Sequence, residues 1–324
     1  MITRRFGRDG PIVSAIGLGC AGMSLPPLDD AEGVATLHAA LDAGVTLLDT
    51  ADFYGMGHNE SLLGRALQGR RDSAFLSVKC GMMRSPTGAF LGLDGRPAAV
   101  KNFATYSLQR LGVEVIDLYQ AGRADPDVPY EETVGAIADL IAEGKVRYLG
   151  VSEVGADLLR RAHGVYPVTA IEIEYSLACR FIEAEILPVA RELGVGVVPY
   201  RVLADGLLSG AVTADHVGGN RHFMSPRLEG ANLAHNVAAT APLQAMARAK
   251  GVSPARLAIE WLLARGPDVV PIVGIRRRAR LAEALAALEP VMDSADLAAL
   301  DQAFAPGAIV GERYPAFVQK FAAR

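Results

Sequence analysis

Cysteine, aromatic residues and long hydrophobic stretches are all scarce in this chain of 324 residues. Its three cysteines, Cys20, Cys80 and Cys179, lie far apart, which matches no zinc spacing and favours a reducing compartment. No segment reaches the apolar length of a membrane span, and the arginine-containing first ten residues have no apolar stretch behind them. We therefore expect a cytoplasmic protein with neither a secretory signal nor a contact with membranes.

Charge is modest as well. Charged residues make up 21% of the chain, hydrophobic residues 51% and aromatic residues only 6%, so the chain can bury a large, mainly aliphatic core. This composition excludes intrinsic disorder. The formal charge of -4 and the pI of about 5.9 imply no broad basic face, so we expect no nucleic-acid partner. A globular enzyme acting on a small molecule is the expectation, and the sequence carries no signal for oligomeric state.

Short apolar runs alternate with longer amphipathic segments along the chain. The expected strands cover residues 15–18, 46–48, 75–78, 115–119, 148–151, 169–173, 196–199 and 269–272. The expected helices include residues 30–43, 97–111, 131–143, 182–193 and 254–264. Eight buried strands separated by helices predict an α/β fold, a (β/α)8 TIM barrel, in one domain spanning residues 1–324.

Two segments lie outside this alternation. Residues 2–14 predict a short N-terminal β-hairpin that turns at Asp9-Gly10. Residues 211–241 form the longest irregular stretch, and we expect them to act as a lid or cofactor clasp. No linker rich in proline, glycine or serine divides the chain.

The glycines of residues 17–22 match the dinucleotide-binding pattern G-x-G-x-x-G and follow a strand. That pattern binds pyrophosphate only when a helix begins at once, because the helix N-terminus holds the phosphates. Here Pro26 and Pro27 follow, which disfavours an immediate long helix. We therefore reject a Rossmann domain and interpret the glycines as a tight turn at a barrel mouth.

Polar residues follow two neighbouring expected strands. Asp49 and Tyr54 come at the end of the second strand, and Lys79 ends the third. Functional groups of such barrels lie at the C-terminal ends of the strands, so these side chains can converge. Lysine near a phenol is expected to lower the tyrosine pKa and make it a general acid. Alternatively, Asp49 caps a turn while Lys79 and Tyr54 lie in solvent, and the spacing alone does not decide.

From Arg4 to Tyr314 the chain resembles the aldo-keto reductase superfamily. The segments that carry the resemblance are LLDTADFYG, SVKCG, IDLYQ, DPDVPYEETVGAIADLIAEGKVRYLGVSE, IEIEYSL and PIVGIRRRARLAEAL. The resemblance implies a barrel that binds NADPH/NADP+ without a Rossmann fold. It also implies that hydride passes to a carbonyl carbon while a tyrosine supplies the proton.

The resemblance assigns roles position by position. Asp49, Tyr54 and Lys79 correspond to three members of the family's catalytic tetrad. Ser152 falls where the family contacts the nicotinamide carboxamide, and Tyr175 where an aromatic ring stacks on the nicotinamide. The remaining cofactor contacts that it implies are Leu203, Gly274, Arg276, Arg280 and Glu283, of which the two arginines would bind the 2'-phosphate and Glu283 the adenine.

The basic run at residues 276–280 has a physical argument of its own. It follows the last expected strand at Gly274 and opens a helix, so guanidinium groups and backbone amides can meet one phosphate. Arg277 and Arg278 are explained equally well as a solvated helix face. We expect cofactor binding from Arg276 and Arg280.

Three positions depart from the family pattern. Gly122 stands where the tetrad histidine is expected, which removes a donor that polarises the substrate carbonyl and leaves volume for a water or a substrate group. Glu172 replaces a glutamine beside the carboxamide. An ionised Glu172 would stabilise the cationic nicotinamide ring of the oxidised cofactor, whereas a protonated Glu172 would behave like glutamine. Arg201 replaces a serine in a stretch near the phosphates, where it can meet the pyrophosphate or an acidic substrate.

These departures leave three hypotheses. The leading one is an NADPH-dependent oxidoreductase that transfers hydride to a C=O, C=N or activated C=C bond of a small organic substrate, with specialised metabolites among the candidates. The second is a non-redox enzyme on the same barrel, catalysing elimination or isomerisation. The third is a cofactor-binding, redox-sensing protein with little catalysis.

Overall fold

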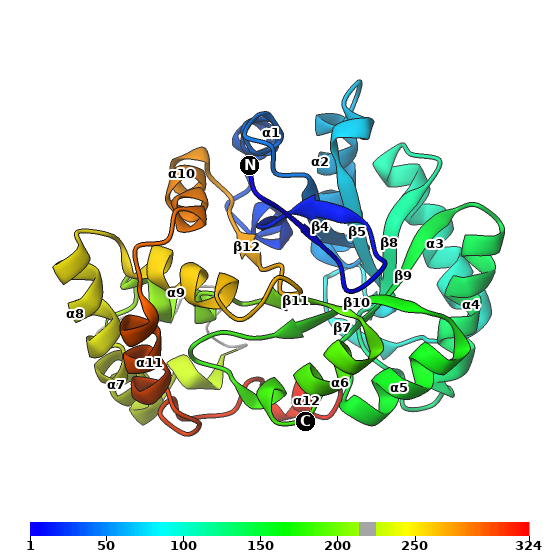
Figure 1. The fold of residues 1–324 in the computed structure, drawn as a ribbon. Coiled ribbons are helices and arrows are strands. Elements are labelled where there is room, and N and C mark those ends of the chain that lie inside the picture. Colours follow the sequence, from blue (N-terminus) through cyan, green and yellow to red (C-terminus); the bar gives the residue numbers. More distant parts are fainter. Residues whose placement is uncertain (214–224, 324) are drawn as a thin grey trace.

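The computed structural model of the chain describes residues 1–213 and 225–323. Its main sheet contains eight parallel strands: β3 (Gly17–Gly19), β4 (Leu47–Ala51), β5 (Phe75–Cys80), β8 (Ile116–Ala121), β9 (Val146–Ser152), β10 (Val168–Glu174), β11 (Gly196–Tyr200) and β12 (Ile272–Gly274). Their order is β11-β10-β9-β8-β5-β4-β3-β12. A parallel bridge between Val197 and Val269 joins the two ends of the sheet. The predicted (β/α)8 barrel is confirmed (Figure 1).

Helices surround the barrel. They are α1 (Asp30–Asp42), α2 (His58–Ala66), α3 (Pro97–Leu111), α4 (Tyr130–Ala142), α5 (Ala156–Val165), α6 (Ile186–Leu193), α7 (Gly230–Ala239), α8 (Ala241–Lys250), α9 (Pro254–Leu263), α10 (Leu281–Leu285), α11 (Ser294–Ala303) and α12 (Ala316–Gln319). α3 and α6 end at Gly112 and Gly194, whose φ angles of 65° and 72° lie in the left-handed region that favours glycine. The expected strands lie close to the observed ones, although the first is shifted to residues 17–19 and the last to residues 272–274.

The N-terminal hairpin is also confirmed. Strands β1 (Thr3–Arg5) and β2 (Ile12–Ser14) pair antiparallel. Phe6 is fully buried and packs in an apolar cluster with interior residues of the barrel, among them Leu47 and Leu118. The hairpin therefore closes the end of the barrel at which the strands begin.

Side chains inside the barrel form layers, because alternate residues of a strand point to the same face. The apolar layer beside Phe6 includes Leu47, Leu118, Ala170 and Val198. Two residues further along the same strands come Asp49, Gln120, Glu172 and Tyr200. The barrel interior thus changes from apolar to polar and ionisable toward the C-terminal ends of its strands.

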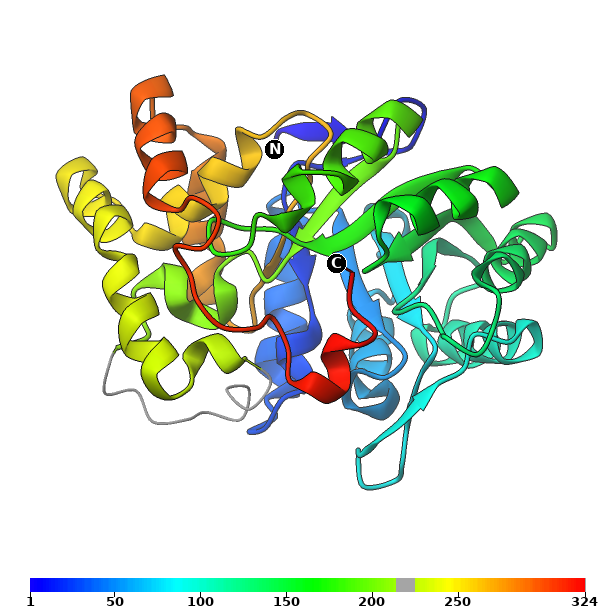
Figure 2. The same cartoon turned by 90° about the horizontal axis from the view of Figure 1, so that it is seen from below.

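Two sequence interpretations need correction. Residues 211–241 are not wholly irregular, because a 3-10 turn at Pro226–Leu228 and helix α7 occupy their second half. Residues 214–224, which contain the rest of the expected lid or clasp, lie outside the described residues. The segment after β5, for which the sequence predicted no strand, contains an antiparallel hairpin, β6 (Met82–Arg84) and β7 (Phe90–Leu93), that projects from the barrel in Figure 2.

The glycine turn behaves as expected. Only a short 3-10 helix, η1 (Ala21–Ser24), directly follows β3.

The three cysteines are buried and free. Within residues 1–213 and 225–323, no helix has the length and apolar character needed to cross a membrane.

Candidate functional site

A cavity of about 920 Å³ opens at the C-terminal ends of the strands. It brings together most of the residues expected to form the site: Asp49, Tyr54, Glu172, Arg201, Leu203, Gly274, Arg276, Arg280 and Glu283. Tyr54 follows β4 and Glu172 lies on β10, whereas Gly274 ends β12 and the last three residues follow it. The cavity therefore has one end above the barrel interior and another end beside the basic run.

Lys79 lies just beneath the cavity between two carboxylates. Its Nζ atom is 2.5 and 2.7 Å from the two carboxylate oxygens of Asp49 and 3.0 Å from Glu172. Burial by itself lowers the pKa of Lys79, but the attraction of Asp49 and Glu172 outweighs it and raises that pKa above its ordinary value. Lys79 is thus a fixed cation, not the solvated side chain of the alternative interpretation.

Tyr54 begins the short helix η2 (Tyr54–Gly57) directly after β4. The Nζ atom of Lys79 lies 5.4 Å from the centre of its ring. The expectation of a lowered tyrosine pKa is wrong, because burial raises the pKa of Tyr54 more than Lys79 lowers it. The phenol therefore holds its proton at neutral pH.

Gln120 and Ser77 complete the polar layer around Lys79. The Gln120 amide donates to Glu172 at 2.6 Å and to Ser77 Oγ at 3.1 Å, and Ser77 donates to Asp49 at 3.0 Å. Sequence reasoning missed Gln120, although its position two residues after Leu118 places it on the interior face.

Ser152, at the end of β9, is 1% exposed, and its Oγ atom has no hydrogen-bond partner in the described part of the chain. A buried hydroxyl without a partner is suited to a polar group of a ligand.

The space beside Gly122 is occupied by protein. A Cβ atom built on Gly122 would lie 3.2 Å from the Phe53 ring and 3.2 Å from the Cys80 carbonyl oxygen. Phe53 lines the cavity and packs edge-on against Tyr54, with ring centres 5.1 Å apart. A Cβ at residue 122 would therefore press on the Phe53 ring, and the expectation that a water or a substrate group fills the remaining volume stays a prediction.

Tyr175 does not reach the cavity. It is fully buried, its hydroxyl donates to Glu183 at 2.7 Å, and its ring packs edge-on against Trp261. The expected stacking of Tyr175 on a nicotinamide is thus corrected, because the ring has no free face. Tyr200, at the end of β11, lines the cavity instead. The two-residue alternation from Val198 could have indicated it from the sequence.

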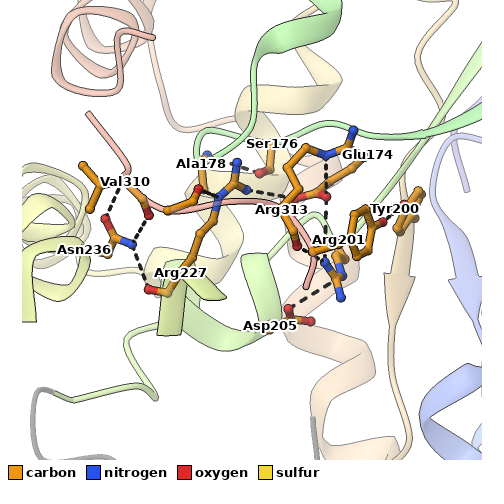
Figure 3. Close-up of polar contacts among 12 residues, drawn as sticks. Glu174, Ser176, Ala178, Tyr200, Arg201, Asp205, Arg227, Asn236, Val310 and Arg313 are labelled. Carbon is orange, nitrogen blue, oxygen red and sulfur yellow. Dashed lines mark hydrogen bonds and ion pairs between the residues drawn. The ribbon is translucent and has the colours of Figure 1, made fainter. Parts of the chain in front are cut away.

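Arg201 also lines the cavity, but it has partners of its own. Its guanidinium donates to the Arg313 carbonyl at 3.1 Å and lies 3.6 Å from Asp205 and 3.9 Å from Glu174 (Figure 3). The structure therefore explains its charge by contacts within the protein. The choice between pyrophosphate and an acidic substrate stays open.

Arg313 anchors the C-terminal segment to the barrel beside the cavity. It lies between two buried carboxylates, 2.6 Å from Glu153 and 3.0 Å from Glu174, and Arg227 contacts Glu174 at 3.0 Å. Figure 3 shows Arg227, Arg313 and Arg201 converging on Glu174. The segment at residues 307–316 thus includes a buried anchor.

At the other end of the cavity, Arg276 donates to the Pro27 carbonyl at 2.7 Å, and Arg280 pairs with Glu283 at 3.1 Å. The Arg280 side chain is 72% exposed. Arg278 pairs with Glu32 on α1, away from the residues that line the cavity. Arg276 and Arg280 are therefore the members of the basic run that line this cavity.

Comparisons with known proteins agree with this architecture. Residues 15–305 match the model of the aldo/keto reductase family. A probable aldo-keto reductase 1 from Glycine max is 38% identical over 315 residues, which are 96% of this chain and 91% of that protein. The glycerol dehydrogenase AKR11B4 from Gluconobacter oxydans is 31% identical with a TM-score of 0.84, covering 96% of this chain and 97% of that one. An aldo/keto reductase from Klebsiella pneumoniae, solved in complex with NADP and acetate, is 29% identical with a TM-score of 0.75, covering 97% and 98%. On the family match and the relative from Glycine max, this chain belongs to the aldo/keto reductase family.

Proposed function

We propose that the protein is an NADPH-dependent oxidoreductase that reduces a C=O, C=N or activated C=C bond of a small organic substrate, with Tyr54 as the proton donor. The observation that carries this proposal is that one cavity is lined by Tyr54, which lies beside a fixed lysine, and by the two arginines Arg276 and Arg280. Such a cavity can hold an elongated anionic cofactor whose reactive end meets an acid.

The residues fit NADPH from end to end. Arg276 and Arg280 would bind the 2'-phosphate, because guanidinium groups form paired hydrogen bonds with phosphate. Glu283 would contact the adenine, and Gly274 leaves room beside β12. The free hydroxyl of Ser152 and the carboxyl of Glu172 would face the carboxamide, and Tyr200 supplies a ring at the same end. Family members from Klebsiella pneumoniae solved with NADP and NADPH support this choice.

When bound, the cofactor supplies a hydride. Tyr54 would donate a proton to the atom of the substrate that gains negative charge, and Lys79 stabilises the phenolate left behind. Asp49 keeps Lys79 charged and oriented. Phe53, Met56, Arg84 and Gly88 line the cavity away from the basic run and would contact the substrate.

The space beside Gly122 bears on the substrate. With the Phe53 ring beside Gly122, none of the described residues that line the cavity is a histidine able to polarise a carbonyl. A substrate that is already activated, such as an iminium ion or a conjugated alkene, needs that donor less. This supports an altered substrate class over a generic aldehyde reductase.

The test is to titrate the protein with NADPH by cofactor fluorescence and then to follow NADPH consumption with panels of carbonyls, imines and activated alkenes. Binding with substrate-dependent NADPH oxidation is expected. Substrate conversion without net NADPH oxidation would favour the non-redox enzyme. Binding without any turnover would favour the redox-sensing protein, and absence of binding would contradict the proposal as a whole.

A further inference from the structure

Asp49, Lys79 and Glu172 form a buried cluster of two carboxyl groups and one ammonium group. The three residues are 2%, 3% and 3% exposed, and both carboxyl groups contact the single ammonium group. With both carboxyl groups ionised, the cluster would carry a net charge of -1 above the apolar layer of the barrel. A buried net charge is costly unless a proton or a cation balances it.

Glu172 is the member of the cluster that can take up that proton. Both carboxylate oxygens of Asp49 accept short hydrogen bonds from Lys79, and one of them also accepts from Ser77. Glu172 makes the longer contact with Lys79. Burial, and then the charge of Asp49, raise the pKa of Glu172 to about 8, although Lys79 lowers it.

The neighbours of Glu172 supply no further cation. Asp49 on β4 and Lys79 on β5 are the charged groups that face it among the described residues. Gln120 on β8 donates an amide hydrogen to it, and the phenol of Tyr54 after β4 is neutral. The neighbouring strands pair Glu172 with Ser152 of β9 and Val198 of β11, which are uncharged. When Glu172 is ionised, the balancing positive charge must therefore come from the cavity.

The shape of the cavity places a nicotinamide at this end. The phosphate-binding arginines lie beyond β12, whereas the proton donor Tyr54 shares the barrel end with Glu172. Hydride transfer requires the reactive ring beside Tyr54, so a bound nicotinamide would lie at the end of the cavity that Glu172 lines. This ring is neutral in NADPH and positively charged in NADP+.

We propose that Glu172 is the countercharge for the oxidised nicotinamide: it holds a proton when the reduced cofactor is bound and releases that proton to solvent when NADP+ binds. This inference rests on the proposed function. One proton leaves the protein for each NADP+ bound, and no bond other than the carboxyl O–H changes. Glu172 thereby couples cofactor affinity to pH, which a glutamine at the same position could not do.

The experiment is calorimetric titration of the whole protein with NADP+ and with NADPH, each in two buffers of different ionisation enthalpy. At pH 7 we expect NADP+ to release close to one proton more than NADPH does. Between pH 6 and 8 the ratio of the two affinities should shift toward NADP+ by up to about tenfold per pH unit, as linkage to one proton requires. Titration of the 2'-phosphate cancels in this ratio because both cofactors carry that group.

Glu172→Gln should abolish both the additional proton release and the pH dependence of the ratio. Glu131→Gln, which changes an exposed carboxylate on α4, should preserve them. Equal proton release by the two cofactors in the unaltered protein, or a pH-dependent ratio that survives in Glu172→Gln, would overturn the inference. Failure of both cofactors to bind would instead overturn the proposed function. The measurements on the unaltered protein keep the test decisive if the variant does not fold.

Discussion

The Phe53 ring lies in tight contact with the position that a Cβ atom on Gly122 would take. Its Cε1 atom would be 3.2 Å from a Cβ at residue 122, tighter than ordinary van der Waals contact. Phe53 also packs edge-on against Tyr54. The absence of a side chain at residue 122 and the presence of an aromatic ring at residue 53 are therefore one structural feature, placed beside the expected proton donor.

This relationship predicts how an imidazole could be restored. The unaltered protein should reduce simple aldehydes and ketones poorly, and Gly122→His alone should gain little because Phe53 obstructs the new side chain. Phe53→Ala combined with Gly122→His should raise NADPH-dependent reduction of simple aldehydes well above either single variant. A well-placed donor to a developing oxyanion contributes up to about 2.7–4 kcal/mol. Turnover of the native substrate should fall in the double variant.

A panel of simple carbonyls, assayed with all four proteins, provides the measurement. Strong activity of the unaltered protein on simple aldehydes, unchanged by Gly122→His, would mean that Tyr54 suffices by itself. The hypothesis of an altered substrate class would then be wrong.

Replacing Tyr54 tests the proton donor. Tyr54→Phe removes the hydroxyl and keeps the ring beside Lys79 and Phe53, so cofactor binding should change little. Loss of a positioned acid lowers rates by about 10²–10⁴. Steady-state turnover and cofactor titration on the same preparation separate the two effects. Ordinary turnover in Tyr54→Phe would show that the resemblance of this residue to the tetrad has no catalytic consequence.

The arginines after β12 predict a preference for NADPH over NADH. Charge-assisted hydrogen bonds to a phosphate contribute about 1.5–3 kcal/mol each, so tenfold or more in affinity is expected. Arg280→Ala should reduce the preference. Arg277→Ala is the matched control, because Arg277 lies outside the cavity lining. Equal affinities for the two cofactors, measured by fluorescence titration, would contradict the assignment of the basic run.

The anchor of the C-terminal segment predicts a large effect on stability. Arg313→Ala would leave Glu153 and Glu174 buried without their shared cation. Removing one partner of a buried ion pair costs about 3–5 kcal/mol. Urea unfolding should show this loss. Arg160→Ala, which breaks an exposed pair with Glu192, should cost much less. Similar losses in the two variants would show that the buried network contributes no more than a surface pair.

Asp52 predicts a dependence of stability on pH. Burial, and then the nearby Glu60, raise the pKa of Asp52 to about 8 from its ordinary 3.8. Between these values the folded protein binds a proton that the unfolded chain has lost, so this residue makes stability fall as pH rises. Asp52→Asn should remove that contribution. The free energy of unfolding of the variant should therefore increase, relative to that of the unaltered protein, as the pH is raised from 5 to 8. A difference that stays constant with pH would contradict the raised pKa.

The barrel, its N-terminal hairpin and the rejection of a Rossmann domain could all be predicted from the sequence. The period of apolar runs and the capping glycines are local signals, so they predict the elements well and their ends to within a few residues. The same holds for Asp49, Tyr54 and Lys79, because the ends of adjacent parallel strands meet in any barrel of this type. Residues 211–241 were harder, since the helix α7 within them has neither a capping side chain nor a strong apolar face.

Only the tertiary structure decided which side chains share the cavity. Tyr175 directly follows β10 and Tyr200 ends β11, yet Tyr175 packs against Trp261 while Tyr200 lines the cavity. The ring of Phe53 beside Gly122, and two carboxylates on one lysine, join residues that are far apart in the chain. The pKa of Tyr54 is decided in the same way, because the burial that raises it is supplied by residues from other parts of the chain. The sequence determined the elements through local periodicity, whereas the packing of distant residues determined the chemistry of the cavity.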